Sequence, residues 1–401
     1  MIDYEDARRK VLSRAKALEA EFVPLIKAFG RVLAGDIRAR EPVPPFRKAA
    51  MDGYAVRSLD VSVVKDDHPI TLDVVEDLPA GKLSRVKIKP GQAIRIMTGA
   101  PIPEAADAVV RVEYTDKKGK KVLIKRRAEP GEYIGEVGED VAKGELVMSR
   151  GEVILGAQMG MLAALGYDKV RVTRKPTVAI IPTGSELVEP GAKLGRGKIR
   201  NSNAYSIYSL VLEAGAEPKY LGVAPDKKAE LRKKIRKAVR FDMVVLTGGV
   251  SVGDYDLVKD QLKDFGVRPV FWQVRIRPGK PIFFGVRRKQ LVFGLPGNPV
   301  SAMLTFQLFV RLAIDQMLGK KKPGLRPGKA ILLDNISVKP GLKKFLRGVL
   351  DQDGMVLQVL PYPFQKSGVL KSMVKSNAMI VVPPEIEVME KGEEVEILFL
   401  N

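Results

Sequence analysis

The sequence predicts a multidomain α/β plus β fold with a central doubly wound α/β domain. Strand-like and helix-like patterns alternate between residues 176 and 320, which is typical of βαβ units. Short β-like runs separated by Pro and Gly turns fill residues 51–147, and the residues after a basic Pro/Gly linker at 320–328 look β-rich throughout. Because 401 residues exceed one ordinary domain, we expect two to four domains.

The first 175 residues predict helices around a β-rich insert. An apolar stripe of Ala7, Val11, Leu12, Ala15 and Leu18 predicts an amphipathic helix within residues 3–20. A Pro-rich stretch at 41–45 ends regular structure. The insert has β-like runs at residues 93–97, 108–112 and 121–124, and a helical pattern returns at 156–165.

The central region predicts a mostly parallel sheet covered by helices. Strands are expected at residues 177–181, 219–223, 243–246, 270–276 and 290–293, and helices at 204–213, 227–239, 257–265 and 300–318. In the last region, residues 349–352 and 355–360 flank Asp353-Gly354, which is a hairpin signal. We expect a small barrel or sandwich there.

Composition excludes several classes of active site. The chain has no cysteine, so disulfides, thiolate metal sites and cysteine nucleophiles are excluded. His68 is the only histidine, which argues against a histidine triad or a multi-histidine zinc site. Catalysis must therefore rest on carboxylates, Lys and Arg, hydroxyls, backbone amides and a bound cation. No apolar run approaches the ~20 residues of a membrane helix, and the acidic N-terminus lacks a signal core, so we expect a cytoplasmic protein without membrane association.

The net charge of +21 has two interpretations. It indicates an anionic partner such as nucleic acid, a phosphate ester or an oxyanion. It also fits a heat-adapted surface rich in Lys, Arg and Glu. The basic residues are spread along the chain and aromatic residues make up 6%, which disfavours a dedicated nucleic-acid surface. We therefore expect no nucleic-acid partner.

The most informative motif is residues 247–256, TGGVSVGDYD, between an apolar run and a helical pattern. Gly248, Gly249, Val250 and Ser251 form a loop whose backbone amides are predicted to hold an anion. Asp254 and Asp256 follow, where a phosphate-bound cation would need oxygen ligands. The motif predicts a site for a phosphate-bearing ligand.

Two further turns leave the same edge of the predicted sheet. In one, Thr183, Gly184 and Ser185 are predicted to cradle phosphate, and Glu186 to bind a cation or a polar ring edge; alone, this motif is equally a turn with a solvent-facing Glu. The other turn consists of Pro296, Gly297, Asn298 and Pro299. Because the carboxyl ends of parallel strands meet at one edge, the three turns favour one binding site.

Other candidate residues are more ambiguous. Arg277 and Lys280 flank a Pro-Gly turn, so they fit either oxyanion binding or a basic surface hairpin. Asn203 precedes the helix expected at 204, where capping by Ser202 or Asn203 competes with a ligand contact. The turns that contain Asp52, Thr98 and Asp140 are ordinary in composition.

Taken together, these motifs resemble the MoeA family, the molybdopterin molybdenumtransferases, which includes the E domain of gephyrin. The matching segments occur in the family's order and span most of the chain. They are Pro45-Phe46, Met51-Asp52-Gly53-Tyr54-Ala55, Met97-Thr98-Gly99-Ala100-Pro101, Gly138-Glu139-Asp140, Pro182-Thr183-Gly184-Ser185-Glu186-Leu187, Gly248 to Asp256, Pro278-Gly279-Lys280-Pro281 and Gly294-Leu295-Pro296-Gly297-Asn298-Pro299-Val300-Ser301.

The resemblance implies insertion of molybdate into adenylated molybdopterin, with hydrolysis of the adenylate and release of AMP. It implies that Glu186 and Asp256 hold Mg²⁺, that the amides of Gly248, Gly249 and Val250 cradle phosphate, and that Arg277 and Lys280 attract molybdate. Asp52, Thr98 and Asp140 would complete the site from the other subunit of a homodimer. In the C-terminal region Lys344, Arg347 and Ser372 match only loosely, so no catalytic role is assigned to them.

The resemblance also implies four domains per subunit: 1–50 with 143–175 for dimerisation, an inserted 51–142, an α/β domain at 176–322, and 328–401. The α/β domain resembles the MogA/MoaB adenylyltransferases, which lack the region with Met51–Ala55 and could supply the substrate as a partner. The alternatives are an adenylyltransferase, a tungstate-selective insertase of the same family and a non-enzymatic scaffold, because a gephyrin-like fold can bind peptides through its C-terminal region.

Overall fold

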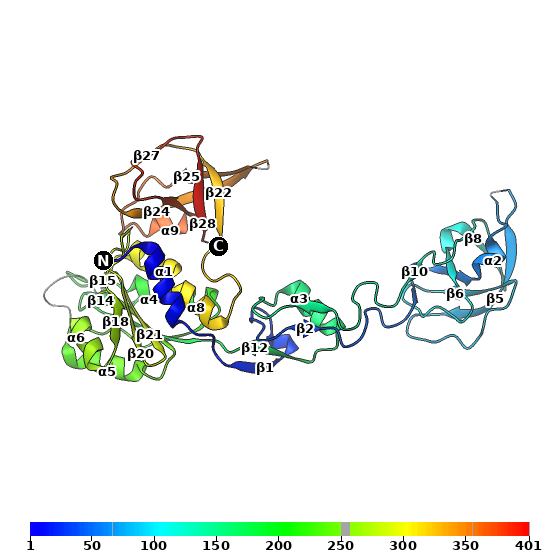
Figure 1. Ribbon diagram of the computed structural model, residues 1–401, viewed down its shortest axis with the longest axis horizontal. Helices are drawn as coiled ribbons and strands as arrows, with labels where there is room; N and C mark the ends of the chain where they lie inside the picture. Colours follow the sequence, from blue (N-terminus) through cyan, green and yellow to red (C-terminus); the bar gives the residue numbers. More distant parts are fainter. Residues whose placement is uncertain (66, 250–256, 355, 401) are drawn as a thin grey trace. The chain divides into compact units, whose positions relative to one another are not determined.

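The computed structural model describes residues 1–65, 67–249, 257–354 and 356–400. The chain forms two compact units (Figure 1). Unit 1 comprises Met1–Gly35, Arg150–Leu155 and Lys169–Asn401, and unit 2 comprises Asp36–Ser149 and Gly156–Asp168. Residues 250–256 of the glycine-rich motif lie outside the described residues, and they include the candidate site residues Val250, Ser251, Asp254 and Asp256.

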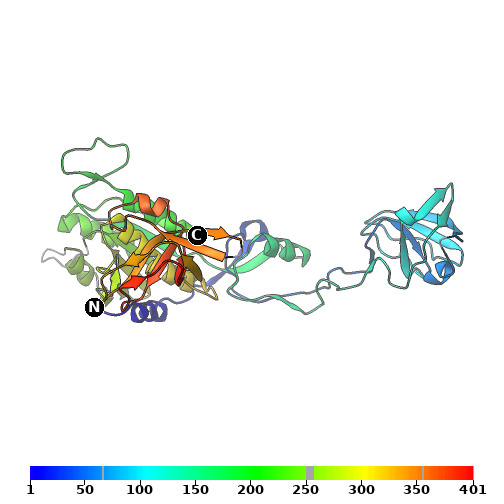
Figure 2. The same ribbon diagram turned by 90° about the horizontal axis from the view of Figure 1, so that it is seen from above.

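Unit 2 contains a six-stranded sheet in the order β7-β4-β6-β5-β9-β8. Its strands are drawn in blue and cyan in Figure 2. The strands predicted at 93–97, 108–112 and 121–124 are confirmed as β6, β7 and β9, and Tyr54, Val56 and Val110 pack in the core. The elements of this unit are β2 (Ile37–Arg38), β3 (Lys48–Ala49), β4 (Gly53–Val56), α2 (Ser58–Val61), β5 (Ile70–Leu78), β6 (Gln92–Ile96), β7 (Ala108–Arg111), η2 (Val112–Tyr114), β8 (Thr115–Lys118), β9 (Lys121–Ile124), β10 (Ile134–Gly135), β11 (Leu146–Met148) and α3 (Gly156–Ala164).

Unit 1 is built around a six-stranded sheet in the order β16-β13-β17-β21-β20-β18. The four strands from β16 to β21 run parallel, as predicted. The sheet consists of β13 (Thr177–Pro182), β16 (Glu217–Tyr220), β17 (Met243–Thr247), β18 (Arg268–Phe271), β20 (Phe283–Arg287) and β21 (Gln290–Leu295). Short strands accompany it: β1 (Ala20–Pro24) pairs with β12 (Lys169–Thr173), and β14 (Leu187–Val188) pairs with β15 (Ile199–Arg200).

Two details of the sheet differ from the sequence prediction. The pattern did not predict β20, which pairs antiparallel with β21. Its segment is buried on both faces, so it lacks the alternation that marks a strand, and its turn contains no glycine. The single strand expected at 270–276 is wrong: β18 ends at Phe271, and Ile276–Arg277 forms β19, which pairs with the C-terminal β24 (Lys343–Asp353).

Helices cover both faces of the sheet because alternate strand residues point in opposite directions. On β13, Val178 and Ile180 pack in one core with α1 (Tyr4–Arg14), α4 (Ser202–Glu213), α7 (Pro299–Thr305) and α8 (Arg311–Leu318). Ala179 and Ile181 pack in the other core with α5 (Lys228–Ala238) and α6 (Leu257–Asp264). The doubly wound α/β arrangement is thereby confirmed.

The helix expected at 300–318 is interrupted by one wider turn. α7 (Pro299–Thr305) leads into a π-helical segment at Phe306–Val310, and α8 (Arg311–Leu318) follows. Gly279 lies against this helix, since a Cβ there would come 2.4 Å from Cγ2 of Thr305. The close contact holds the turn that carries Arg277 and Lys280 against α7.

The C-terminal region forms a closed five-stranded barrel. The strand order is β24-β25-β22-β28-β26, and β26 also pairs with β24 to close the sheet. The hairpin predicted at Asp353-Gly354 is confirmed by the pairing of β24 with β25. The elements are β22 (Pro327–Leu332), β23 (Ile336–Ser337), β25 (Val356–Pro361), α9 (Lys371–Val374), β26 (Ala378–Val382), β27 (Val388–Met389) and β28 (Glu394–Phe399).

α1 connects the barrel with the α/β sheet. Tyr4 packs edge-on against Phe309 of the interrupted helix and Phe345 of β24, with ring centroids 5.8 and 5.0 Å away. Burial raises the pKa of the Tyr4 phenol well above its usual range. Within the described part of the chain, no helix is long and apolar enough to cross a membrane.

Candidate functional site

The carboxyl edge of the central sheet brings the three predicted turns together. Strands β13, β17 and β21 are adjacent and parallel, so the segments after Pro182, Thr247 and Leu295 leave the sheet side by side. They line a cleft of about 500 Å³. Its lining includes the predicted residues Thr183, Gly184, Glu186, Gly248, Gly249, Pro296, Gly297 and Asn298.

The turn after β13 is fixed by hydrogen bonds to its neighbours. The amide of Thr183 donates to the carbonyl of Thr247 at 2.8 Å. Ser185 and Asp226 are bonded twice, because the Ser185 amide donates to Oδ2 of Asp226 and the Asp226 amide donates to Oγ of Ser185, each at 2.9 Å. Glu186 is exposed and lies so close to Gly184 that a Cβ there would meet its carboxylate at 2.4 Å. The turn therefore presents one carboxylate to the cleft, and Gly184 leaves space for it.

The turn after β17 depends on two glycines. Gly248 and Gly249 have φ values of 85° and 62°, which favour glycine. A Cβ on Gly248 would come 2.6 Å from the carbonyl oxygen of Thr183, and one on Gly249 would come 2.7 Å from Oγ1 of Thr183. The predicted role of the Gly248 amide needs correction, since this amide donates to the carbonyl of Leu295 at 3.0 Å. The contribution of Gly248 is its missing side chain, which allows the turn to approach the carbonyl oxygen of Thr183.

The turn after β21 leads directly into α7. Asn298 precedes the helix and Pro299 is its first residue, where a missing amide hydrogen costs nothing. Nδ2 of Asn203 donates to the carbonyl of Gly297 at 2.8 Å and thus connects this turn with α4. The expected helix cap differs: Oδ1 of Asn201, and not Ser202 or Asn203, accepts the amide of Ala204.

A second, basic cleft of about 1060 Å³ adjoins the first. Pro281 lines both clefts. Arg277 and Lys280 are exposed and line the basic cleft together with Lys344 of the barrel. Burial, with the nearby positive charge of Arg277, lowers the pKa of Lys344. The fold therefore concentrates positive charge beside the glycine-lined cleft.

The structure buries the guanidinium of Arg347, a residue to which the sequence analysis assigned no role. Arg347 is fully buried, and its Nε donates to Oγ of Ser372 at 3.1 Å. Its Nη2 donates to the carbonyls of Phe364 and Lys366, which belong to the lining of the basic cleft. Burial lowers the pKa of Arg347 to about 10, and its Nη1 has no hydrogen-bond partner among the described residues. A buried cation is normally paired with a carboxylate, so an unpaired one marks a candidate functional residue. The spacing of residues in the sequence does not show burial and could not reveal it.

Asp52, Thr98 and Asp140 lie in unit 2. Oδ1 of Asp52 accepts both the amide and the hydroxyl of Thr98 at 2.7 Å. The Thr98 hydrogen bonds lower the pKa of the Asp52 carboxyl, which is therefore ionised at neutral pH. Asp140 is exposed, and its amide donates to the carbonyl of Val43. Asp52 and Thr98 thus form one preorganised pair.

A resident metal site is not complete among the described residues, where no three His, Cys, Asp or Glu side chains gather around one point. Glu186 is the predicted metal ligand that the structure describes, and its predicted companion Asp256 lies outside that part. Mg²⁺ takes one or two carboxylates and completes its shell with substrate phosphates and water. The single described carboxylate, Glu186, therefore fits a Mg²⁺ ion that is bound together with substrate phosphates.

Comparisons with known proteins follow the whole length of the chain. Residues 2–166 match the MoeA N-terminal region (domain I and II), residues 179–316 a probable molybdopterin binding domain, and residues 329–400 the MoeA C-terminal region (domain IV). The molybdopterin molybdenumtransferase of Bacillus subtilis is 36% identical over 405 residues, covering 100% of this chain and 94% of the relative.

The chain belongs to the MoeA family. Molybdopterin molybdenumtransferase 2 of Mycobacterium tuberculosis is also 36% identical, with 99% of each chain covered. The crystal structure of a molybdopterin biosynthesis MoeA protein from Pyrococcus horikoshii OT3 superimposes with a TM-score of 0.86 at 35% identity, covering 100% of both chains. In this MoeA-family chain the two clefts lie within segments that match the family.

Proposed function

We propose that this chain inserts molybdate into adenylated molybdopterin, with hydrolysis of the adenylate and release of AMP. The observation that carries the proposal is the shared wall of the two clefts at Pro281. One cleft offers a narrow, glycine-lined space that fits the pyrophosphate of the adenylate. The other cleft offers the cations that bind an oxyanion. A MoeA-family enzyme requires both in one place.

The division of labour follows from the residues present. The turns at Thr183–Glu186 and Gly297–Asn298 are proposed to bind the adenylate, and Gly248 and Gly249 let the turn after β17 pack closely against Thr183 beside it. Arg277, Lys280 and Lys344, which line the neighbouring basic cleft, are proposed to bind molybdate beside it. Cleavage of a phosphoanhydride depends mainly on positioning and on neutralising charge, so a site without histidine or cysteine suffices.

Mg²⁺ is proposed as an aid to this reaction. Glu186 and Asp256 would hold it, and it would neutralise charge on the pyrophosphate oxygens. Asp52, which is held ionised by Thr98, and Asp140 are proposed to complete the site from a second copy of the chain. The proposed partners are that second copy and a MogA/MoaB-like adenylyltransferase that supplies the substrate, and the proposed compartment is the cytoplasm.

The decisive experiment supplies purified adenylated molybdopterin and molybdate and measures AMP release and the molybdenum content of the product. We expect both to rise together and to stop when Mg²⁺ is chelated. A parallel incubation with ATP and unmodified molybdopterin tests for adenylyltransferase activity. Formation of adenylated pterin there, without metal insertion in the first assay, would replace the proposal by that alternative. Competition between tungstate and molybdate in the same assay measures the oxyanion preference.

The shared site is tested by mixing Asp52→Ala with Asp256→Ala subunits. Each variant alone should be inactive, and exchanged heterodimers should recover activity at the one interface that carries both natural residues. Verified heterodimers that recover nothing would disprove the composite arrangement while leaving the reaction itself untouched.

A further inference from the structure

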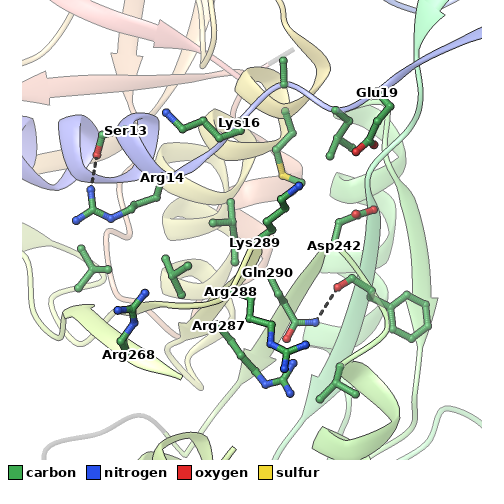
Figure 3. Close-up of a pocket in the computed structure, with 18 of the residues that line it drawn as sticks. Ser13, Arg14, Lys16, Glu19, Asp242, Arg268, Arg287, Arg288, Lys289 and Gln290 are labelled. Carbon is green, nitrogen blue, oxygen red and sulfur yellow. Dashed lines mark hydrogen bonds between the residues drawn. The ribbon is translucent and has the colours of Figure 1, made fainter. Parts of the chain in front are cut away.

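A cavity of about 860 Å³ lies at the amino edge of the central sheet, opposite the candidate site. It is lined by residues at the beginnings of β18 and β21, by the β20–β21 turn and by the segment that follows α1 (Figure 3). Buried Leu291, Met317 and Val286 provide apolar lining. Strands of five or six residues separate the two edges, which places the cavity roughly 17–20 Å from the carboxyl edge.

The cavity gathers cations from four distant parts of the sequence. Six of them form no ion pair with any carboxylate in the described part of the chain: Arg14, Lys16, Arg268, Arg287, Arg288 and Lys289. Arg14 and Lys16 approach from one side, and Arg287 and Arg288 approach from the β20–β21 turn on the other side (Figure 3). Nε of Arg287 is held by the carbonyl of Phe265 at 2.8 Å, so its remaining guanidinium groups can face a ligand. All of the six except Arg287 are exposed to solvent, so water weakens their mutual repulsion, and an anion placed between them would interact favourably with several at once.

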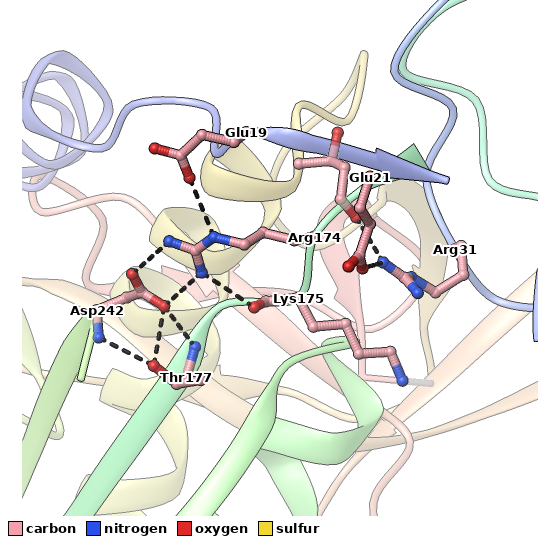
Figure 4. Close-up of polar contacts among 8 residues, drawn as sticks. Glu19, Glu21, Arg31, Arg174, Lys175, Thr177 and Asp242 are labelled. Carbon is pink, nitrogen blue, oxygen red and sulfur yellow. Dashed lines mark hydrogen bonds and ion pairs between the residues drawn. The ribbon is translucent and has the colours of Figure 1, made fainter. Parts of the chain in front are cut away.

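The two carboxylates of the lining are already engaged. Asp242 receives Nη1 and Nη2 of Arg174, each at 2.8 Å, and Glu19 receives its Nε at 3.0 Å (Figure 4). Oδ2 of Asp242 also accepts the amide and hydroxyl of Thr177 at 2.8 and 2.9 Å. Arg174 is therefore neutralised. Neither carboxylate forms an ion pair with the six other cations in the described part of the chain, although, after its backbone hydrogen bond and Arg174, the charge of Lys289 also helps to lower the pKa of Glu19.

Arg288 occupies a backbone position that an arginine does not favour. It is the first residue of the two-residue turn between β20 and β21, where Arg287 pairs with Gln290. Its φ is +55°, in the region where glycine or asparagine is preferred in such hairpins. The turn itself would be better made by glycine, so the arginine side chain needs another explanation. An arginine in an unfavourable backbone conformation beside a cavity supports a ligand contact.

We propose that this cavity binds a phosphorylated organic anion of nucleoside diphosphate size, separately from the substrate site. The volume lies in the range of small-ligand pockets, ~300–1,000 Å³. Arginine forks match phosphate oxygens in pairs, and cations on both sides suit a diphosphate. The apolar lining, which includes Phe241, suits a ring. Nucleic acid is disfavoured because it requires an open track with several stacking aromatics.

The test uses ADP as the probe and the full-length protein. Equilibrium dialysis compares the wild type with Arg288→Gly and with the pair Lys16→Gln and Arg268→Gln. A control pair, Arg232→Gln with Lys233→Gln, removes two exposed cations from α5 outside the cavity. We expect the cavity variants to bind ADP at least roughly tenfold more weakly, as for lost charge-assisted hydrogen bonds, and the control pair to bind as the wild type does.

Two further readouts separate the cavity from the substrate site. AMP release during metal insertion should stay unchanged in Arg288→Gly, because no catalytic residue is altered. Photolabelling with 8-azido-ADP, followed by peptide mapping, should mark residues 13–19 or 286–291. The proposal is overturned if the cavity variants bind ADP as tightly as the wild type. It is equally overturned if only Arg277→Gln with Lys280→Gln weakens binding, or if the label is found only at the carboxyl edge.

Discussion

The carboxyl and amino edges of the central sheet differ in the groups that they offer for binding an anion. At the carboxyl edge, glycines bring strand ends within van der Waals distance of one another, and Gly248 has no space for even one methyl group. At the amino edge, an ion-paired network fixes the strand beginnings, and arginines without an ion pair in the described part of the chain line an open cavity. One edge relies on backbone shape and the other on side-chain charge, so substitutions should affect them in different ways.

The largest effect is expected from Gly248→Ala. Its Cβ would overlap the carbonyl oxygen of Thr183, and the positive φ adds strain. We expect a loss of about 3–4 kcal/mol in the free energy of unfolding, measured with urea, and insertion activity reduced to near background. Gly266→Ala is the matched control, because Gly266 also has a positive φ but nothing within 4 Å of its Cβ position. That control should lose only about 1–2 kcal/mol. Equal losses would mean that strain, and not the close approach, governs the carboxyl edge.

Asp242→Asn should come next and should leave the chemistry intact. Burial alone would raise the pKa of Asp242, but hydrogen bonds from Arg174 and Thr177 outweigh it and lower the pKa. Removing the charge should cost about 2–3 kcal/mol of unfolding free energy at pH 7. Insertion per folded molecule should remain within twofold of the wild type.

The same carboxylate sets a pH dependence. Because its pKa is lower when folded, its stabilisation is complete above the unfolded value of ~3.9 and is lost as the pH falls through the folded value. The stability difference between wild type and Asp242→Asn should therefore shrink below about pH 4. Urea unfolding between pH 3 and 7 measures it, and a difference that stays constant throughout would show that Asp242 has no depressed pKa.

A smaller effect is expected at the carboxyl edge from Arg277→Gln with Lys280→Gln. Both residues are exposed, so thermal stability should change little. The molybdate concentration for half-maximal insertion should rise roughly tenfold, since charge-assisted hydrogen bonds are lost. Titration of product against molybdate for both proteins checks this, and an unchanged titration would reduce the pair to a solvated surface turn.

The smallest effect is a gain in stability from Arg288→Gly at the amino edge. Glycine relieves the strain at φ +55° but makes the unfolded chain more flexible, which leaves a net stabilisation of about 0.5–1 kcal/mol. A small rise in melting temperature, measured by calorimetry without ligand, checks it. A loss of stability would mean that Arg288 stabilises the fold, so its unfavourable backbone would no longer support a ligand contact.

Local patterns in the sequence predicted much of this structure. The apolar stripe predicted α1, continuous apolar runs predicted β13, β17 and β21, and glycines after those runs predicted the turns at the carboxyl edge. These patterns can be recognised in the sequence because each depends only on neighbours within a few residues. Family resemblance extended them to the MoeA assignment, whereas the domain boundaries, the metal ligands and the role of Asp140 stay predictions.

Other features required the tertiary structure. β20 is buried on both faces and could not be recognised by alternation, and Arg347 is defined by its burial in the barrel. The amide of Gly248 is occupied only because β21 lies beside β17.

The distribution of charge shows most clearly what the sequence alone could not predict. In sequence the basic residues are scattered, which disfavoured a dedicated nucleic-acid surface and gave no sign of the cavity at the amino edge, yet Arg14, Arg268 and Arg288 line it together. Composition and local periodicity determine which elements form and where the chain turns. Which distant side chains meet is decided by the order of strands in the sheet, because that order depends on packing between segments far apart in the chain.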